Sequence, residues 1–403
     1  MIDTHASGDA SLTSRPLEGV RAVVLGDLPA GTIAGSLLSD LGAEVIRVSS
    51  PTESNPLTAR PPVVGEASLA WSIIARSSKN ATCNFKDPDS VHFLRQLLLH
   101  VDIVIESFGP RVLEGHGFDP SDLAASAVVV RISAYGQDGP YRDYPGDDLT
   151  ALAFSGVAHL TGHRGGVPVA LAAAVADHFC AVASTQAAIA ALIGRHDSGR
   201  GEIIDAPLYG AALRITEWAI PAADRLGIMR TREGNFPSNS APLGVYASSD
   251  DQFVAIVGGS DANFRRLVDA MGGTSIDDPR FATPKQRSEL ADEVNDLVRS
   301  WTASLSIEEI EARCFASGVP FGRVYTASDL SSDPHFLARG DLATVNDPVV
   351  GDVVQPSQYP RFVGATIVPP VAPSALGADN EYVWCEIAGL SSDDLQQIQS
   401  GGH

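Results

Sequence analysis

The first fifty residues contain two apolar, strand-like runs separated by a segment with helical spacing. The runs are Val20–Leu28 and Glu44–Val48, and the helical pattern spans Thr32–Leu41. Short connections between a strand, a helix and a second strand are typical of a β–α–β unit. This opening predicts an α/β fold built on a Rossmann-like, open parallel sheet.

The same alternation continues through the first half of the chain. Ser90–Val101 has the spacing of an amphipathic helix, while Asp102–Glu106 and Val128–Ile132 are strand-like runs followed by polar, glycine-containing loops. Such loops line the ligand crevice of open α/β sheets. The first turn, Gly26–Gly31, is not G-x-G-x-x-G, so we predict no nicotinamide dinucleotide site. A helix N-terminus after a strand still suits a phosphate.

A chain of 403 residues exceeds the size at which one hydrophobic core usually stops growing, so we expect two domains. The predicted order is a flexible tail (1–17), the first part of a large α/β domain (18–224), a smaller α+β domain (225–325) and a return segment that completes the large domain (326–403). No unbroken apolar run reaches the length of a membrane span, and the tail lacks the pattern of a signal peptide.

Several stretches are harder to assign from the residue pattern. Ser49–Leu69 and Pro348–Pro373 are rich in Pro and are predicted to be loops, and the polar patch Arg76–Asn80 is predicted to precede a short strand. In the smaller domain, Arg287–Ser304 has the spacing of one helix and Phe253–Val257 that of a strand.

Composition narrows the classes of partner. The chain has 49 acidic and 28 basic residues, with a net charge of −21, which argues against a nucleic-acid-binding protein. An anionic ligand would need a few local Arg or Lys side chains and helix N-termini. The four cysteines are far apart and form no C-x-x-C pair. We therefore predict no zinc or redox motif and expect reduced thiols in a cytoplasmic protein.

One acid, Asp177, lies in an apolar run at the start of a small-residue helix that extends to about Leu192. Alone, it would be a capping or first-turn residue stabilised by free N–H groups and by the helix dipole, which would keep its carboxylate ionised. His178 points about 100° around the helix, which predicts a surface or packing role. Two adjacent acids, Asp147 and Asp148, precede another helix and are expected to cap it.

Segments spread from Leu17 to about Gly401 resemble the family III CoA-transferases, which include formyl-CoA transferase, carnitine CoA-transferase and the α-methylacyl-CoA racemases. Any one segment is weak evidence, but the series in order is strong. The segments are LEGVRAVVLGDLPAG, DIVIESFGPRVLEGHGFDPSDL, ISAYGQDGPY, GDDLTALAFSG, GEIIDAPLYGAAL, APLGVYASSDDQFVAI and GVPFGRVYTASDLSSDPHFLARG.

The resemblance implies an enzyme that moves CoA from an acyl-CoA thioester to a carboxylic acid, with no tightly bound cofactor and no metal. It also implies an intertwined homodimer, in which 200–225 and 348–373 would be the crossing links. Asp177 occupies the place of the family's nucleophilic aspartate, which forms a mixed anhydride and then an aspartyl-CoA thioester. Gly258 and Gly259 stand where the family has a longer glycine loop over that aspartate; an ordinary strand–helix turn is the alternative.

The family pattern places CoA against the loops that follow the first strands. The residues at these places are Leu28, Pro29, Ala30, Ser107, Ser133 and Tyr135. Small side chains stand where several members have Arg, Asn or Lys, namely at Ser50, Ser107, Gly115 and Ser133. Basic residues that could replace these phosphate contacts are Arg47, Arg60, Arg76, Lys79 and Arg111.

Two alternatives remain open from the sequence. A racemase of this group uses the His of a Gly-His-Asp turn, but here the turn is Gly146-Asp147-Asp148, and a carboxyl group has the wrong resting pKa for that role. A non-catalytic CoA-binding paralogue is favoured by the missing basic contacts and opposed by the presence of Asp177.

Overall fold

The computed structural model describes residues 15–52, 55–237, 239–273, 276–363 and 368–400, so most of the expected N-terminal tail lies outside the described residues. The chain divides into two compact units. The larger comprises residues up to 157, 171–217 and those from 337 onward; the smaller comprises 158–170 and 218–336. The small domain expected at 225–325 lies inside the range 218–336 of the smaller unit.

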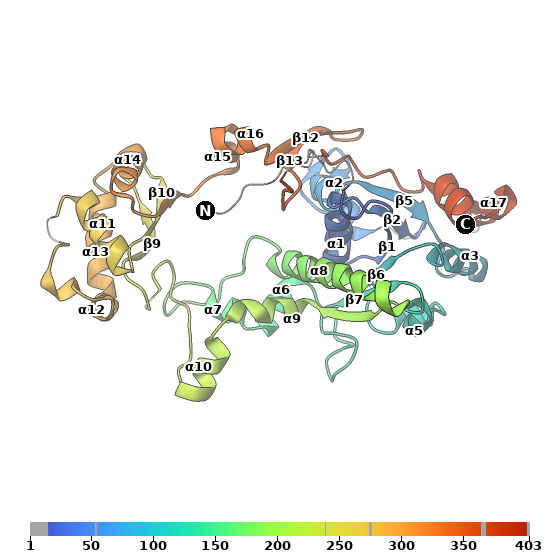
Figure 1. The fold of residues 1–403 in the computed structure, drawn as a ribbon, viewed down its shortest axis with the longest axis horizontal. Coiled ribbons are helices and arrows are strands. Elements are labelled where there is room, and N and C mark those ends of the chain that lie inside the picture. Colours follow the sequence, from blue (N-terminus) through green and yellow to red (C-terminus); the bar gives the residue numbers. More distant parts are fainter. Residues whose placement is uncertain (1–14, 53–54, 238, 274–275, 364–367, 401–403) are drawn as a thin grey trace, which may run out of the picture. The chain divides into compact units, whose positions relative to one another are not determined.

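A six-stranded parallel sheet forms the centre of the larger unit (Figure 1). Its strand order is β5-β2-β1-β6-β7-β8. The strands are β1 (Arg21–Gly26), β2 (Glu44–Ser49), β5 (Ser78–Thr82), β6 (Ile103–Ser107), β7 (Val128–Ser133) and β8 (Ile203–Pro207). Their near-continuous runs of Val, Ile and Ala are typical of parallel strands buried on both faces. The predicted α/β fold class is confirmed.

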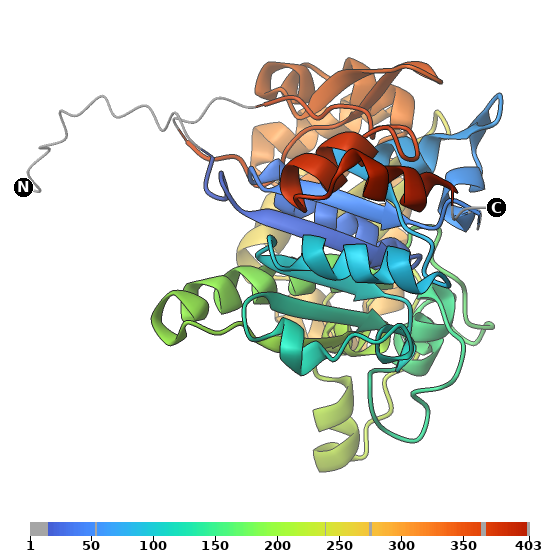
Figure 2. The same cartoon turned by 90° about the vertical axis from the view of Figure 1, so that its right-hand side faces the viewer.

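Helices cover both faces of this sheet, and successive residues of β1 point alternately into two apolar cores. Ala22 and Val24 pack with one set of helices, and Val23 and Leu25 with the other. The first set is α1 (Pro29–Asp40), α6 (Asp148–Phe154), α8 (Val175–Ser198) and α9 (Leu208–Leu213). The second set is α3 (Pro88–Leu98), η4 (Glu381–Ile387) and α17 (Ser392–Ser400). Figure 2 shows α3 and α17 on the near side of the sheet.

Shorter elements lie in the connections, several of them in stretches predicted to be loops. They are η1 (Pro56–Ala59), β3 (Val63–Val64), β4 (Ala67–Ser68), α2 (Leu69–Ile74), α4 (Val112–Gly115), α5 (Pro120–Leu123), α7 (Val157–Leu160), η2 (Arg214–Thr216) and the hairpin β12 (Leu342–Asp347) and β13 (Gly351–Pro356). The polar patch at 76–80 does not precede its strand but contributes the first three residues of β5. Elements this short or this polar show no clear hydrophobic period.

Helix α8 is long and apolar enough, by length and composition alone, to cross a membrane, with a mean hydropathy of 1.3 over an 18-residue window. The sequence prediction of no membrane span rested on unbroken apolar runs, and Asp177 and His178 interrupt this one near its start. In the structure the helix packs on α1, β7 and β8. Its apolar composition therefore fits a core helix of the larger unit.

The smaller unit contains a three-stranded antiparallel sheet with the order β11-β10-β9 and its own apolar core. Its elements are α10 (Ala219–Leu226), β9 (Leu243–Ala247), β10 (Phe253–Val257), α11 (Asp261–Met271), η3 (Pro279–Phe281), α12 (Pro284–Glu289), α13 (Ala291–Thr302), α14 (Ile307–Ser317), β11 (Phe321–Arg323), α15 (Ala327–Ser332) and α16 (Pro334–Arg339), which ends in the larger unit. The single helix predicted over 287–304 is wrong, because the chain breaks at Leu290 between α12 and α13.

The strand order reverses between β1 and β6, and ligands of open α/β sheets bind at the carboxyl ends of strands at such a point. Gly26 ends β1 here with a φ of +91°. A Cβ at this residue would lie 2.5 Å from the carbonyl carbon of Ser107, the last residue of β6. Only glycine allows the two strand ends to come this close.

We expect Gly26→Ala to lower the free energy of unfolding by about 2–4 kcal/mol, because it adds a backbone overlap to a positive-φ strain. Gly19→Ala is the matched control, since Gly19 has a similar φ of +88° but no atom within 4 Å of the added Cβ. That control should lose only about 1–2 kcal/mol. Urea denaturation of both variants measures the difference, and equal losses would contradict the close-approach argument.

Candidate active site

Asp177 lies in the first turn of α8 and is only 2% exposed. The helix has no side-chain cap, and the backbone N–H of Asp177 donates instead to Oδ1 of Asp148 at 3.0 Å. Asp148 is the first residue of α6, whose N-cap is Asp147, so the predicted capping role of Asp147 is confirmed. An acid from α6 thus satisfies one of the free N–H groups at the start of α8.

The Asp177 carboxyl lies at the start of α1 as well. Helix α1 has no side-chain cap either, and the N–H of Ala30 in its first turn lowers the pKa of this carboxyl. Oδ1 of Asp177 is buried and has no hydrogen-bond partner among the described residues. Buried polar atoms without a partner are uncommon in folded proteins and call for a functional explanation. A reacting group that meets its partner only in the substrate is such an explanation.

The electrostatic surroundings of Asp177 disfavour its ionised form. Burial raises the pKa of this carboxyl to about 7, and the negative charges of Asp148 and Asp147 act in the same direction. The positive charge of Arg60 and the Ala30 N–H lower the pKa but do not compensate. The helix dipole therefore does not keep the pKa of this carboxyl at its ordinary value, because desolvation raises the pKa. Strongly shifted pKa values of this kind concentrate at functional sites.

A cleft of about 390 Å³ lies at the carboxyl edge of the sheet. Its lining residues are Leu28, Phe108, Gly109, Pro110, Val112, Ser133, Ala134, Arg142, Asp143, Tyr144, Pro145 and Gly146. Leu28 stands two residues before Ala30, and Gly146 stands two residues before Asp148. The segments that lead into Ala30 and Asp148 therefore line this cleft, at the position where open α/β sheets bind ligands.

A buried ion-pair network shapes one wall of this cleft. Arg131 on β7 donates to Glu106 at the end of β6 and to Glu114 in α4, at 2.7 and 2.8 Å. The other oxygen of Glu106 accepts from the N–H of Phe108. Because these bonds hold both ends of the loop after β6, the backbone from Phe108 to Val112 keeps one course along the cleft.

Of the predicted CoA contacts near the first turn, the structure brings Leu28 and Ser133 to this cleft and Tyr135 close to it. The ring of Tyr135 contacts that of Tyr144, a lining residue. Ser107 is buried below the cleft, and its hydroxyl donates to the carbonyl of Leu25. Pro29 and Ala30 follow Leu28 as the first two residues of α1, where Pro29 suits a helix start.

Four of the five predicted basic contacts fall in three different places. Arg111 lies at the carboxyl edge of the sheet and pairs with Asp143, a residue of the cleft. Arg47 is buried, with its guanidinium bonded to the carbonyl of Gly26 and to the hydroxyl of Thr32. The prediction that it contacts CoA is corrected accordingly, since these bonds turn the guanidinium inward.

Arg76 and Lys79 lie at the opposite, amino-terminal edge of the sheet. Arg76 pairs with Asp40 at the end of α1, and Lys79 stacks on Tyr382, whose hydroxyl donates to Glu44 at the start of β2. Strands of a parallel sheet begin at one edge and end at the other. These two residues therefore do not join the cleft at the carboxyl edge, contrary to the prediction.

The Gly258–Gly259 turn is closely packed within the smaller unit. The N–H of Gly258 donates to the carbonyl of Pro242, and the carbonyl of Gly259 accepts from the buried Arg287. A Cβ at Gly259 would lie 1.9 Å from Oγ of Ser240. These contacts favour an ordinary strand–helix turn over a loop that covers Asp177. The N–H of Gly258 already donates within the turn and is not free for a substrate, and close packing restricts movement of the turn.

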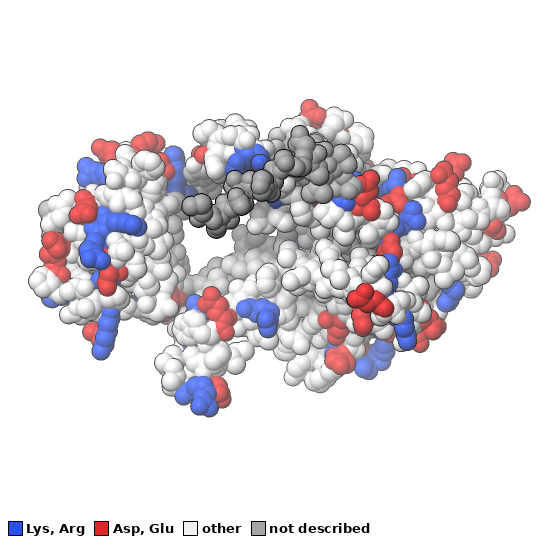
Figure 3. Space-filling view, in the orientation of Figure 1, with Lys and Arg blue, Asp and Glu red and all other residues white. Residues whose placement is uncertain are grey.

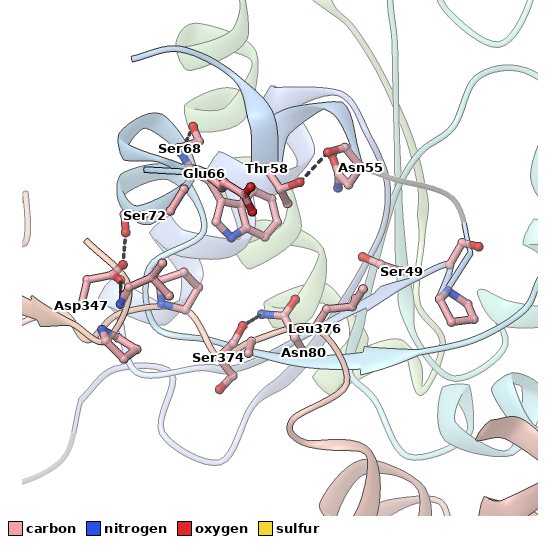
Figure 4. A pocket seen from close by; sticks show the side chains of 18 of the residues that line it. Ser49, Asn55, Thr58, Glu66, Ser68, Ser72, Asn80, Asp347, Ser374 and Leu376 are labelled. Carbon is pink, nitrogen blue, oxygen red and sulfur yellow. Dashed lines mark hydrogen bonds between the residues drawn. The ribbon is translucent and has the colours of Figure 1, made fainter. Parts of the chain in front are cut away.

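A second pocket of about 540 Å³ adjoins α2 and η1 (Figure 4). Most of its polar side chains carry hydroxyl or amide groups, such as Asn80, whose amide donates to the carbonyl of Ser374 at 2.6 Å. Its charged lining residues, among those that the structure describes, are the acids Glu66 and Asp347. The described lining of this pocket therefore offers no cation to the phosphates of CoA.

Two interactions of Asp177, with Asp148 and with Arg60, cannot be predicted from the residue pattern. Asp148 was expected only as a cap of its own helix, although it contacts Asp177 from 29 residues away. The charge of Arg60 suggests phosphate binding from the sequence, although in the structure this residue acts electrostatically on Asp177. The signal for the first is that Asp148 lies in a segment of the family pattern and Asp177 occupies the place of the family's nucleophile. No local pattern indicates the second.

On the face shown in Figure 3, basic side chains lie in separate spots between acidic ones. Within the coloured residues of that view they form no continuous stripe of the kind that follows a nucleic-acid backbone.

Comparisons with known proteins identify the family of this chain. The sequence pattern of CoA-transferase family III matches residues 17–380. The succinyl-CoA–D-citramalate CoA-transferase of Chloroflexus aurantiacus is 34% identical over 392 residues, or 96% of this chain and 97% of the relative. The succinate–glutarate CoA-transferase of Agrobacterium fabrum is 31% identical over 360 residues, or 85% and 88%. The crystal structure of a CaiB/BaiF family protein from Brucella suis matches with a TM-score of 0.81 and 28% identity, over 93% of this chain and 100% of that one. The chain is therefore an enzyme of CoA-transferase family III, as its sequence segments predicted.

Proposed function

We propose that the protein transfers CoA from an acyl-CoA thioester to a carboxylic acid, with Asp177 as the nucleophile. The observation that carries the proposal is the buried Asp177 carboxyl, whose Oδ1 has no described partner. The segments that lead into Ala30 and Asp148 line the cleft at the switch point of the sheet. A carboxylate in a site that excludes water can form covalent intermediates without losing them to hydrolysis.

In the proposed reaction, the Asp177 carboxylate attacks the carbonyl carbon of the acyl-CoA. The carbon–sulfur bond breaks, and CoA leaves as a thiolate with the electron pair. The thiolate attacks the aspartyl carbon of the mixed anhydride, which releases the donor acid as a carboxylate and leaves an aspartyl-CoA thioester. The acceptor carboxylate repeats both steps in reverse order, so the Asp177 carboxylate is regenerated and no net proton is exchanged.

We further propose that donor and acceptor are short dicarboxylic acids, with succinyl-CoA as the donor. The two curated relatives are named for transfer involving succinyl-CoA, D-citramalate, succinate and glutarate. Each of these acids carries two carboxyl groups, of which only one becomes a thioester.

The test is to incubate the protein with succinyl-CoA and a panel of carboxylic acids and then to add hydroxylamine. New acyl-CoA products and a hydroxamate on the peptide that contains Asp177 are expected. Exchange of the α-hydrogen of a 2-methylacyl-CoA for deuterium, without transfer, would support the racemase alternative instead. No chemistry in either assay would favour the non-catalytic paralogue.

The pH dependence of transfer should follow the raised pKa of Asp177. Because only the ionised carboxyl attacks, kcat/KM is expected to fall as the pH drops below about 7. Asp148→Asn should move this acidic limb about one unit lower, because it removes a neighbouring negative charge but keeps an oxygen that accepts the Asp177 N–H. The exposed Asp122→Asn is the control and should leave the profile unchanged. An Asp148→Asn profile identical to wild type would contradict the assignment.

Assembly into a homodimer and a cytoplasmic location are part of the proposal. Exposed apolar side chains in and after α10, including Ile220, Leu226 and Met229, would suit a contact with a second chain. All four cysteines are free, which fits a reducing compartment. Light scattering coupled to gel filtration would measure the mass of the particle.

A further inference from the structure

Arg60 is a cation close to Asp177, the proposed nucleophile. The guanidinium of Arg60 has no partner among the described residues. The residue ends η1 and is exposed. Among the residues that the structure describes, none forms a hydrogen bond or ion pair with its side chain. Its charge nevertheless stabilises the ionised form of Asp177. An interaction of this kind requires the two groups to lie within the range of solvent screening.

The backbone of Arg60 is fixed on one side by α2. Its carbonyl accepts from the hydroxyl of Ser68, which is also the N-cap of that helix. Its N–H donates to the carbonyl of Leu57, and Asn55 caps the start of η1 through the N–H of Leu57. Figure 4 shows Thr58 beside Asn55, to whose carbonyl the hydroxyl of Thr58 donates. The guanidinium therefore extends from an anchored backbone.

Helix α2 is in turn tied to the part of α1 that holds Asp177. The ring of Trp71 lies 4.9 Å from the guanidinium of Arg47. Arg47 donates to the hydroxyl of Thr32 at 2.6 Å, in the first turn of α1. Helix α1 packs against α8, the helix that carries Asp177, and the N–H of Ala30 in the same turn lowers the pKa of the Asp177 carboxyl. This chain of contacts holds Arg60 and Asp177 in one framework.

We propose that Arg60 binds the non-reacting carboxylate of a dicarboxylate substrate while the other end of that substrate reacts at Asp177. The inference rests on the proposed function. Asp147 and Asp148 make the surroundings of the nucleophile acidic, so a second free carboxylate on the substrate needs a cation to offset their repulsion. A planar guanidinium meets this need, because it can donate two parallel hydrogen bonds to one carboxylate.

The experiment compares dicarboxylates with monocarboxylates of the same length. Wild type, Arg60→Gln and Arg60→Lys are assayed with succinyl-CoA and glutarate and, separately, with butyryl-CoA and pentanoate. Arg60→Gln should lower kcat/KM for the dicarboxylate pair about 10- to 100-fold, mostly through KM, and change the monocarboxylate pair less than about 3-fold. Arg60→Lys should recover part of the loss. The matched control is Arg313→Gln, an exposed arginine on α14 in the smaller unit.

Equal losses with both pairs would overturn the inference, because they would indicate a contact with CoA or a structural role for Arg60. No loss with either pair would also overturn it, while leaving the proposed function intact. Wild-type enzyme that transfers CoA only between monocarboxylates would overturn the inference and the proposed dicarboxylate substrates, but not CoA transfer by Asp177. Absence of transfer by the wild type with every substrate would remove the proposed function itself, and the inference with it.

Discussion

Asp177→Asn is expected to lower the rate of CoA transfer at least about 1,000-fold, because the amide keeps the shape of the side chain but is a far poorer nucleophile. Transfer is measured by following the new acyl-CoA chromatographically. The variant should also give no hydroxamate on the peptide that contains residue 177, although it should still bind CoA in the cleft lined by Leu28 and Ser133.

His178→Ala is the matched control for this result. His178 is the next residue on α8 and is exposed, as predicted, and one of its ring nitrogens lies 2.8 Å from the carbonyl of Ala174. Because its side chain does not take part in the proposed chemistry, the control should keep its activity within about 3-fold of wild type. An Asp177→Asn enzyme with comparable activity would refute the assignment of the nucleophile.

The Asp177→Asn substitution is also expected to stabilise the protein at neutral and alkaline pH. The pKa of the Asp177 carboxyl rises from an ordinary value of 3.8 when unfolded to about 7 when folded. Between these pH values the folded state keeps a proton that the unfolded state has lost, so the free energy of unfolding falls as the pH rises. Above pH 7 wild type should therefore be less stable than Asp177→Asn by up to about 4 kcal/mol.

Thermal unfolding at a series of pH values measures this effect. The stability advantage of Asp177→Asn should be near zero below pH 4, grow between pH 4 and 7, and stay constant above. Asp224→Asn, an exposed change on α10, should show no such growth. An advantage that does not depend on pH would mean that the charge of Asp177 is not the cause, and a loss of stability at pH 8 would contradict the desolvation argument.

The fold class and the position of Asp177 could be predicted because the signals for both are local. Hydrophobic period identified β1, α1, β2, α3, β6 and β7, and the acid at the start of α8 lies in a segment that the family pattern covers. Short elements such as the β3–β4 hairpin could not be predicted in this way. They are held by contacts such as the hydroxyl of Ser68 with the carbonyl of Arg60 rather than by an apolar face of their own.

The sequence alone could not predict which basic residues lie at the functional edge of the sheet. Arg47, Arg76 and Lys79 have the right charge for phosphate contacts, but the functional edge of a parallel sheet is decided by strand order and direction. Arg47 is directed inward onto the turn after β1, and the other two lie where β5 begins. Arg60 shares their charge and has a free guanidinium among the described residues, but only the packing of η1 on α2 reveals its link to Asp177.

The sequence by itself determined the α/β order, the family and the acid most suited to be the nucleophile. These follow from hydrophobic period and from residues that are neighbours along the chain. Only the tertiary structure decided the protonation of that acid and the partners that surround it. Burial and the approach of Asp148, Ala30 and Arg60 set its pKa, and none of these is encoded in the residues next to Asp177.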